Sequence, residues 1–249
     1  MNNHRKRAIL LGIQFILATV SAIIGLLLYN PILNGPDYLI NGAEHANQVI
    51  WGAIMELILV ITAIGTTITL FPLIRKQNET IAIGYLCFRF LEAIVITVGI
   101  ISVLSLLTLS QEFVNAGATN AAFYQASGTL LKAVHDWTFM FGPKLFLGIN
   151  TLMYSYLLYK SKLVPRIISI WGLTGATLIF IVGVLEMFGI IVPFSTAEAI
   201  LAMPGVAAFE MILAGWLIVK GFNVSALASE SDRTKATNYG NKPFDKVGI

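Results

Sequence analysis

The run IAIGYLCFRFLEAIVITVGIISVLSLLTL, residues 81–109, decides the class of fold. A helix needs about 20 consecutive apolar residues to cross the hydrocarbon core of a bilayer, and this run exceeds that length. It nevertheless contains Arg89 and Glu92, two ionisable side chains in a segment otherwise suited to lipid. The run therefore predicts a transmembrane helix, and its two charges are candidates for a functional site.

The composition of the whole chain supports the same class. Of the 249 residues, 57% are hydrophobic and only 12% are charged, whereas about a quarter of the residues of a soluble domain are charged. The single cysteine, Cys87, excludes an internal disulfide bond. We therefore predict an integral, all-α, polytopic membrane protein.

Six segments are long and apolar enough to cross a bilayer. The first follows a basic stretch, as a signal peptide would, but its apolar run is longer than a signal core of about 7–15 residues, so we expect a retained helix. The predicted spans lie near residues 8–29, 49–74, 81–109, 138–159, 167–191 and 199–219. Residues 1–222 would form one six-helix transmembrane domain, and residues 223–249 a mobile polar tail.

The distribution of basic residues predicts the orientation, because cytoplasmic loops are enriched in Lys and Arg. With six spans, 13 of the 16 Lys and Arg residues fall on one side. They are Arg5, Lys6, Arg7, Arg75, Lys76, Lys160, Lys162, Arg166, Lys220, Arg233, Lys235, Lys242 and Lys246. Both termini are therefore predicted to be cytoplasmic, and the net charge of +3 reflects topology rather than nucleic-acid binding.

The predicted outer loop after residue 109 contains a second helical pattern. In AAFYQASGTLLKAVHDW, residues 121–137, the apolar and aromatic side chains fall roughly on one face. This pattern predicts a short helix at the outer interface, before the fourth span enters the membrane.

Ionisable residues within the spans, or at their outer ends, are the candidate site. A rise of 1.5 Å per residue places them in the middle and outer half of the bilayer. They are Glu56, Arg89, Glu92, His135, Asp136, Lys144, Glu186 and Glu210. The spans would contain four carboxylates and two cations, and burial disfavours the charged form of a carboxyl group. We therefore expect at least one of Glu56, Glu186 and Glu210 to hold a proton at neutral pH.

Several of these residues allow a structural interpretation as well as a functional one. Arg89 and Glu92 are three residues apart on one helix face and can form an ion pair that fixes helix packing or binds a ligand. Pro143 favours a kink next to Lys144, which either lines a cavity or extends outward to the lipid interface. His135 and Asp136 could act in acid–base chemistry, ligate a metal, or begin a helix. No metal-ligand spacing accompanies them, so no metal or cofactor is predicted.

Three stretches, residues 85–93, 156–172 and 204–222, resemble the bacterial membrane family catalogued as domain of unknown function 4386. They read YLCFRFLEA, YLLYKSKLVPRIISIWG and PGVAAFEMILAGWLIVKGF. The resemblance covers most of the chain outside the tail. It implies a six-helix protein of the bacterial inner membrane, and it transfers no catalytic role because the family has no established activity.

The favoured hypothesis is a protein that binds a small polar or lipid-derived ligand in a charged pocket, with Arg89 as an anion contact and the glutamates as proton or cation sites. An intramembrane enzyme acting on lipid, a proton-coupled transporter and a structural subunit are the alternatives. The chain has no G-x-S-x-G, H-E-x-x-H, C-x-x-C or phosphate-binding glycine motif, which disfavours catalysis. Membrane lipid is the expected partner, and the sequence does not fix the oligomeric state.

Overall fold

The computed structural model describes residues 3–117, 119–193, 196 and 205–223, and within these ranges the chain is helical with no strand. Residues 224–249 of the predicted tail, and residues 199–204 of the predicted sixth span, lie outside the described residues. The elements are α1 (Asn3–Leu28), α2 (Asn30–Leu33), α3 (Tyr38–Glu44), α4 (Ala46–Ile74), α5 (Glu79–Asn115), α6 (Ala121–Met140), the π-helix η1 (Phe141–Phe146), α7 (Leu147–Ser161), α8 (Arg166–Met187) and α10 (Val206–Val219).

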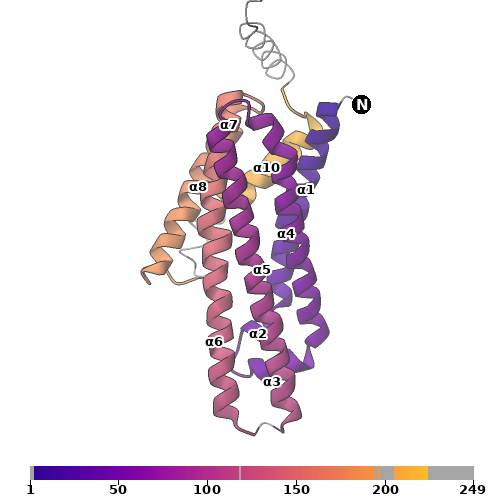
Figure 1. Ribbon diagram of the computed structural model, residues 1–249, viewed down its shortest axis with the longest axis vertical. Coiled ribbons are helices and arrows are strands. Elements are labelled where there is room, and N and C mark those ends of the chain that lie inside the picture. Colours follow the sequence, from indigo (N-terminus) through magenta and orange to yellow (C-terminus); the bar gives the residue numbers. More distant parts are fainter. Residues whose placement is uncertain (1–2, 118, 194–195, 197–204, 224–249) are drawn as a thin grey trace, which may run out of the picture.

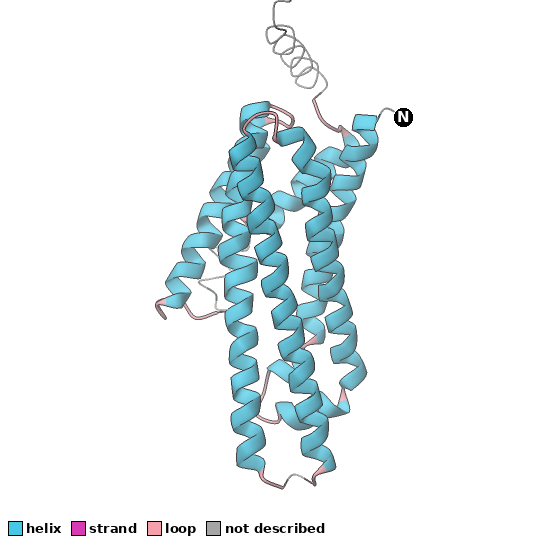
Figure 2. Cartoon of the chain, viewed as in Figure 1, coloured by secondary structure: helices cyan, strands magenta, loops and turns pink. Residues whose placement is uncertain are grey.

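The long helices run along one axis of an elongated bundle (Figures 1 and 2). The helices α1, α4, α5 and α8 are each long and apolar enough to cross a membrane, and α10 is a shorter apolar helix. Many large apolar side chains point outward, such as Leu27, Ile61 and Ile68, which are 67%, 61% and 68% exposed. Such side chains suit a lipid environment, so the fold is that of a membrane-embedded protein.

The helices contact one another in a closed order. Each of α1, α4, α5, α7, α8 and α10 contacts the next, and α10 contacts α1 again. Arg5 of α1 donates hydrogen bonds to the carbonyl oxygens of Leu217 and Ile218 in the last turn of α10, at 3.2 and 2.6 Å. The described chain therefore begins and ends at the same end of the bundle (Figure 1).

The helix predicted near residues 121–137 is present, but it is not a separate interfacial element. The segments α6, η1 and α7 follow one another without a loop, from Ala121 to Ser161, and α6 packs along α5. The Ser102 hydroxyl donates to the carbonyl oxygen of Leu131 at 2.7 Å, and the Phe113 and Tyr124 rings lie 5.4 Å apart. The difference arises because α5 continues to Asn115, past its predicted end, and so offers α6 a partner along its length.

Two apolar clusters fill opposite ends of the bundle. One lies at the end that carries the N-terminus and is centred on Tyr154, whose ring contacts the rings of Phe15, Tyr85 and Phe209. The other packs Tyr29, Ile32, Val49 and Val103 toward the opposite end. The buried charged residues lie between these clusters, which positions the site described next.

Candidate functional site

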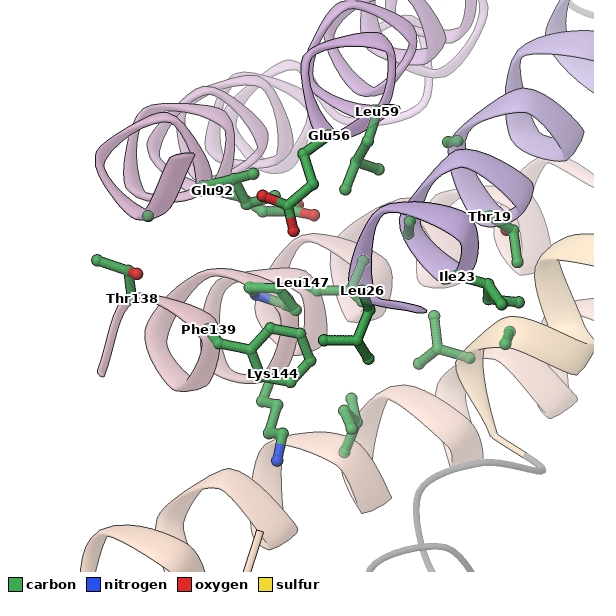
Figure 3. Close-up of a pocket in the computed structure, with 18 of the residues that line it drawn as sticks. Thr19, Ile23, Leu26, Glu56, Leu59, Glu92, Thr138, Phe139, Lys144 and Leu147 are labelled. Atoms are coloured by element: carbon green, nitrogen blue, oxygen red, sulfur yellow. The ribbon is translucent and has the colours of Figure 1, made fainter. Parts of the chain in front are cut away.

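A cavity of about 450 Å³ lies inside the ring of helices. Helices α1, α4, α5, α6, η1, α7, α8 and α10 all contribute to its wall. Most of the lining side chains are apolar, including Ala22, Leu26, Leu59, Ile96 and Ile179. Figure 3 shows Glu56 extending from α4 toward the cavity, with Lys144 on the opposite side of the cavity.

Six of the eight residues proposed from the sequence line this cavity. They are Glu56, Arg89, Glu92, His135, Lys144 and Glu210. Glu186 does not line the cavity but contacts Lys144, and Asp136 lies outside with 69% of its side chain exposed. Helices far apart in the sequence thus bring charged groups to one place inside an apolar bundle.

Arg89 and Glu92 form the ion pair expected from their spacing. One terminal nitrogen of Arg89 lies 3.3 and 3.1 Å from the two carboxylate oxygens of Glu92, and both side chains are almost fully buried. The Nε–H of Arg89 donates to the carbonyl oxygen of Ala63 at 3.3 Å, and the Asn150 amide donates to Glu92 at 2.6 Å. These contacts compensate the cost of burying both charges, and they leave Arg89 less available as an anion contact.

Lys144 is buried rather than extended toward the lipid interface. Its Nζ lies 2.7 Å from both carboxylate oxygens of Glu186, and each side chain is only 3% exposed. Lys144 belongs to the π-helical turn η1, which also contains Pro143. A proline without an N–H cannot continue regular α-helical bonding, so the irregularity predicted at Pro143 takes the form of a π-helical segment, a feature that is frequent at functional sites.

Glu56 is buried on α4, where two glycines, Gly25 and Gly52, allow side chains to pack directly against the backbone. A Cβ atom at Gly25 would lie 2.9 Å from the Glu56 Cγ, and one at Gly52 would lie 2.7 Å from the Tyr29 ring. The glycines therefore provide the space in which the Glu56 and Tyr29 side chains lie next to each other. The hydroxyl of Tyr29 is buried without a hydrogen bond of good geometry, although it lies near the Glu56 carboxyl group.

Glu210 is held by hydroxyl groups. Thr19 on α1 and Tyr154 on α7 donate to its two oxygens over long distances of 3.3 and 3.5 Å. Arg89 acts on Glu210 through space, but no ion pair within 4.0 Å joins them. Within the described part of the chain, neither Glu56 nor Glu210 has an ion pair.

His135 is buried in the cavity wall, close enough to Glu56 to interact electrostatically. Its Nδ1 lies 3.5 Å from the neighbouring Asp136 carboxylate, which is at the limit for a hydrogen bond. His45 is exposed and contacts the carbonyl oxygen of Asn41 at 3.0 Å. No group of three or more His, Cys, Asp and Glu side chains in the described ranges converges as a metal site would.

Asn150, Thr19 and Tyr154 contact the charged groups and were not predicted from the sequence. Asn150 bridges Glu92 and the Phe146 carbonyl oxygen, at 2.6 and 2.7 Å. Thr19 and Tyr154 contact Glu210. Asn150 could have been noticed as an uncharged polar residue in a predicted span, whereas threonine and tyrosine are too common in such helices to stand out.

The arrangement leaves an acidic cavity. Among the described residues, ion pairs join the buried Arg89 to Glu92 and the buried Lys144 to Glu186. Glu56 and Glu210 then face the same cavity without a cation of their own in the described residues. Two such carboxyl groups in a largely apolar cavity can hold protons or bind a cation.

Fold and site together define an all-helical, membrane-embedded protein with a charged interior. Residues 10–221 match the family described as domain of unknown function (DUF4386), and the chain belongs to this family. No curated protein and no solved structure matches the chain.

Proposed function

We propose that this protein binds a small polar or lipid-derived ligand in the cavity, in the middle and outer half of the bilayer. The observation that carries the proposal is the convergence of Glu56 and Glu210 on a cavity of about 450 Å³. This volume lies within the range of about 300–1,000 Å³ that is usual for small-molecule sites. An enclosed carboxylate is costly unless it is neutralised, and a bound ligand can supply the neutralising charge.

The charge balance favours a ligand with a positively charged head group and an apolar body. Arg89 and Lys144 already contact carboxylates, so the cavity offers little to an anion. Glu56 and Glu210 would contact the cationic head, and the apolar lining would contact the body. Glu92, His135 and Lys144 would complete the wall, Glu186 would hold Lys144, and Asp136 would act only at the outer edge.

A dansyl-labelled alkylamine, compared with its uncharged N-acetyl derivative, tests this function. The purified protein in detergent should bind the amine and enhance its fluorescence, and it should bind the acetylated probe at least about tenfold more weakly, since one charged contact is worth roughly 1.4 kcal/mol or more. Glu56→Gln and Glu210→Gln should each weaken binding of the amine. Glu112→Gln, at an exposed position on α5 that does not line the cavity, is the matched control.

Equal binding of the two probes, or unchanged binding in both cavity variants, would contradict the proposed cationic ligand. A structural subunit predicts no specific binding of either probe. A proton-coupled transporter would bind the amine and also accumulate it in proteoliposomes in response to a pH gradient.

An intramembrane enzyme acting on lipid is the second candidate, because buried His135 faces the cavity near Glu56. A histidine and a carboxyl group in a shared site can perform general acid–base chemistry. Protein in phosphatidylglycerol and phosphatidylethanolamine vesicles should then convert lipid with time, measured by mass spectrometry, and His135→Gln should abolish the conversion. Absence of any lipid product would remove this candidate.

We further infer six membrane crossings with both termini in the cytoplasm of a bacterial cell, in the inner membrane. The closed helix order and the shared location of the two ends of the described chain support an even number of crossings. Residues 1–222 would form the transmembrane domain, and residues 223–249 the polar tail. The accumulation of Lys and Arg at the end of the bundle where the described chain begins and ends supports the orientation.

A further inference from the structure

A second hollow has a volume of about 420 Å³. The elements that line it, α8 and α10 among them, meet at the end of the bundle opposite the end of α5 (Figure 1). It is formed where α7 turns into α8 and where α10 ends. Three cations line it, Lys162, Arg166 and Lys220, together with Trp216 and Phe222. No acidic side chain is among the described residues that line it.

The local backbone holds this hollow in shape. Lys162 ends α7 in a left-handed conformation, with φ of 57°, and Gly221 turns the chain after α10 with φ of 78°. The Asn223 N–H then donates to the carbonyl oxygen of Leu163 at 2.8 Å, which ties the end of α10 to the α7–α8 turn. The three cations therefore project from two connected turns of the chain rather than from unrelated surface positions.

The charge of the hollow is uncompensated within the described part of the chain. None of Lys162, Arg166 and Lys220 takes part in an ion pair there, and Arg166 lies 5.0 Å from the centre of the Tyr159 ring. Helix α8 begins at Arg166 without a side-chain cap, so its first N–H groups add partial positive charge. Arginine and lysine together with free N–H groups are the usual ligands of phosphate.

Two of the lining cations, Arg166 and Lys220, are adjacent in the chain to exposed apolar side chains. Ile167 on α8 and Val219 on α10 are 75% and 69% exposed, and Trp216 of the lining is partly buried. In a membrane-embedded bundle such side chains face acyl chains, while the cations lie beside them at head-group level. A soluble anion has no apolar part that could contact these side chains.

We propose that this hollow binds the phosphate group of an anionic phospholipid. Arg166 and Lys220 contact the phosphate oxygens, Lys162 adds charge at the rim, and the acyl chains lie along Ile167 and Val219. The site is separate from the cavity between the two apolar clusters and does not depend on what that cavity binds.

Native mass spectrometry of the purified full-length protein tests the proposal. The protein should retain phosphatidylglycerol roughly tenfold to thirtyfold more tightly than phosphatidylcholine of the same acyl chains, and Arg166→Gln combined with Lys220→Gln should abolish this preference. Lys76→Gln combined with Lys160→Gln is the matched control, because it removes two exposed cations at the same end that do not line the hollow. An unchanged thermal midpoint in these variants, and in the single substitutions Arg166→Gln and Lys220→Gln, would show that a loss of lipid preference does not arise from unfolding.

Three results would overturn the proposal. The first is an unchanged phosphatidylglycerol preference in the Arg166 and Lys220 variants. The second is an equal loss in the control, which would indicate general surface charge rather than a site. The third is displacement of the lipid by millimolar inorganic phosphate, which would assign the hollow to a soluble anion.

Discussion

At the scale of single residues, each buried charge lies among specific polar neighbours. Arg89 contacts Glu92 and a main-chain carbonyl oxygen, and Glu92 also accepts from Asn150. Lys144 contacts Glu186. Buried pairs of this kind stabilise a fold less than their geometry suggests, but the loss of one member is costly because the other is left without compensation.

The Arg89–Glu92 pair should therefore behave as one unit. We expect Arg89→Gln to lower the free energy of unfolding by about 3 kcal/mol. The double variant Arg89→Gln with Glu92→Gln should lose less than the sum of the two single losses, by at least about 1 kcal/mol. Thermal or denaturant unfolding in detergent measures this cycle. Additive losses would show that the two side chains act independently, and unchanged amine-probe binding in Arg89→Gln would assign the pair a structural role.

Gly25 should control the position of Glu56. An added Cβ would lie 2.9 Å from the Glu56 Cγ and 3.3 Å from the Gly52 carbonyl oxygen, so Gly25→Ala must displace one of them. We expect this variant to bind the amine probe several-fold more weakly, as measured by fluorescence. Gly215→Ala, where a Cβ meets nothing within 4 Å, should leave binding unchanged.

At the scale of elements, α8 packs against the residue that precedes α10 through a close contact between their main chains. A Cβ at Gly175 would lie 2.6–2.8 Å from main-chain atoms of Gly205, which cannot rotate away as a side-chain end could. Small residues permit such contacts between membrane helices. The α8–α10 contact is one side of the closed ring around the cavity.

Gly175→Ala should thus separate α8 from the start of α10. We expect a loss of roughly 1–3 kcal/mol, the usual cost of overpacking a tight site, and hence a lower thermal midpoint. Gly215 lies within α10, and a Cβ added there has no atom within 4 Å. Because alanine favours a helix more than glycine does, Gly215→Ala should leave the thermal midpoint equal or slightly higher. The reverse order of the two midpoints would contradict this close contact.

At the scale of the whole molecule, the contact between α1 and α10 closes the bundle and places the first and last described residues at the same end of it. This arrangement requires an even number of crossings if the long helices span the membrane. Of the predicted crossings, α1, α4, α5 and α8 are each long and apolar enough to span a membrane, and α10 is a shorter apolar helix.

Cysteine accessibility in cells tests the topology. In a Cys87→Ser background, single cysteines introduced at Lys6 and Gln77 should be protected from a membrane-impermeant maleimide until the membrane is opened. Cysteines at Asp37 and Thr119 should react in intact cells. Labelling of Lys6→Cys together with Asp37→Cys in intact cells would contradict six crossings with a cytoplasmic N-terminus.

The sequence by itself determined the all-helical class, the family and most of the charged residues of the cavity. These features depend on local properties: the length of an apolar run, and a spacing of three residues that places Arg89 and Glu92 on one helix face. Even the irregularity at Pro143 follows from a missing N–H.

Only the tertiary structure decided which charges meet and which face the cavity without a partner. Lys144 contacts Glu186 on another helix, and Asn150 contacts Glu92, because helix packing sets the rotation of each helix about its axis. The same packing places α6 against α5 and leaves the Asp136 side chain exposed, outside the cavity. Rotation and pairing depend on contacts between segments far apart in the chain, and no local pattern of residues specifies them.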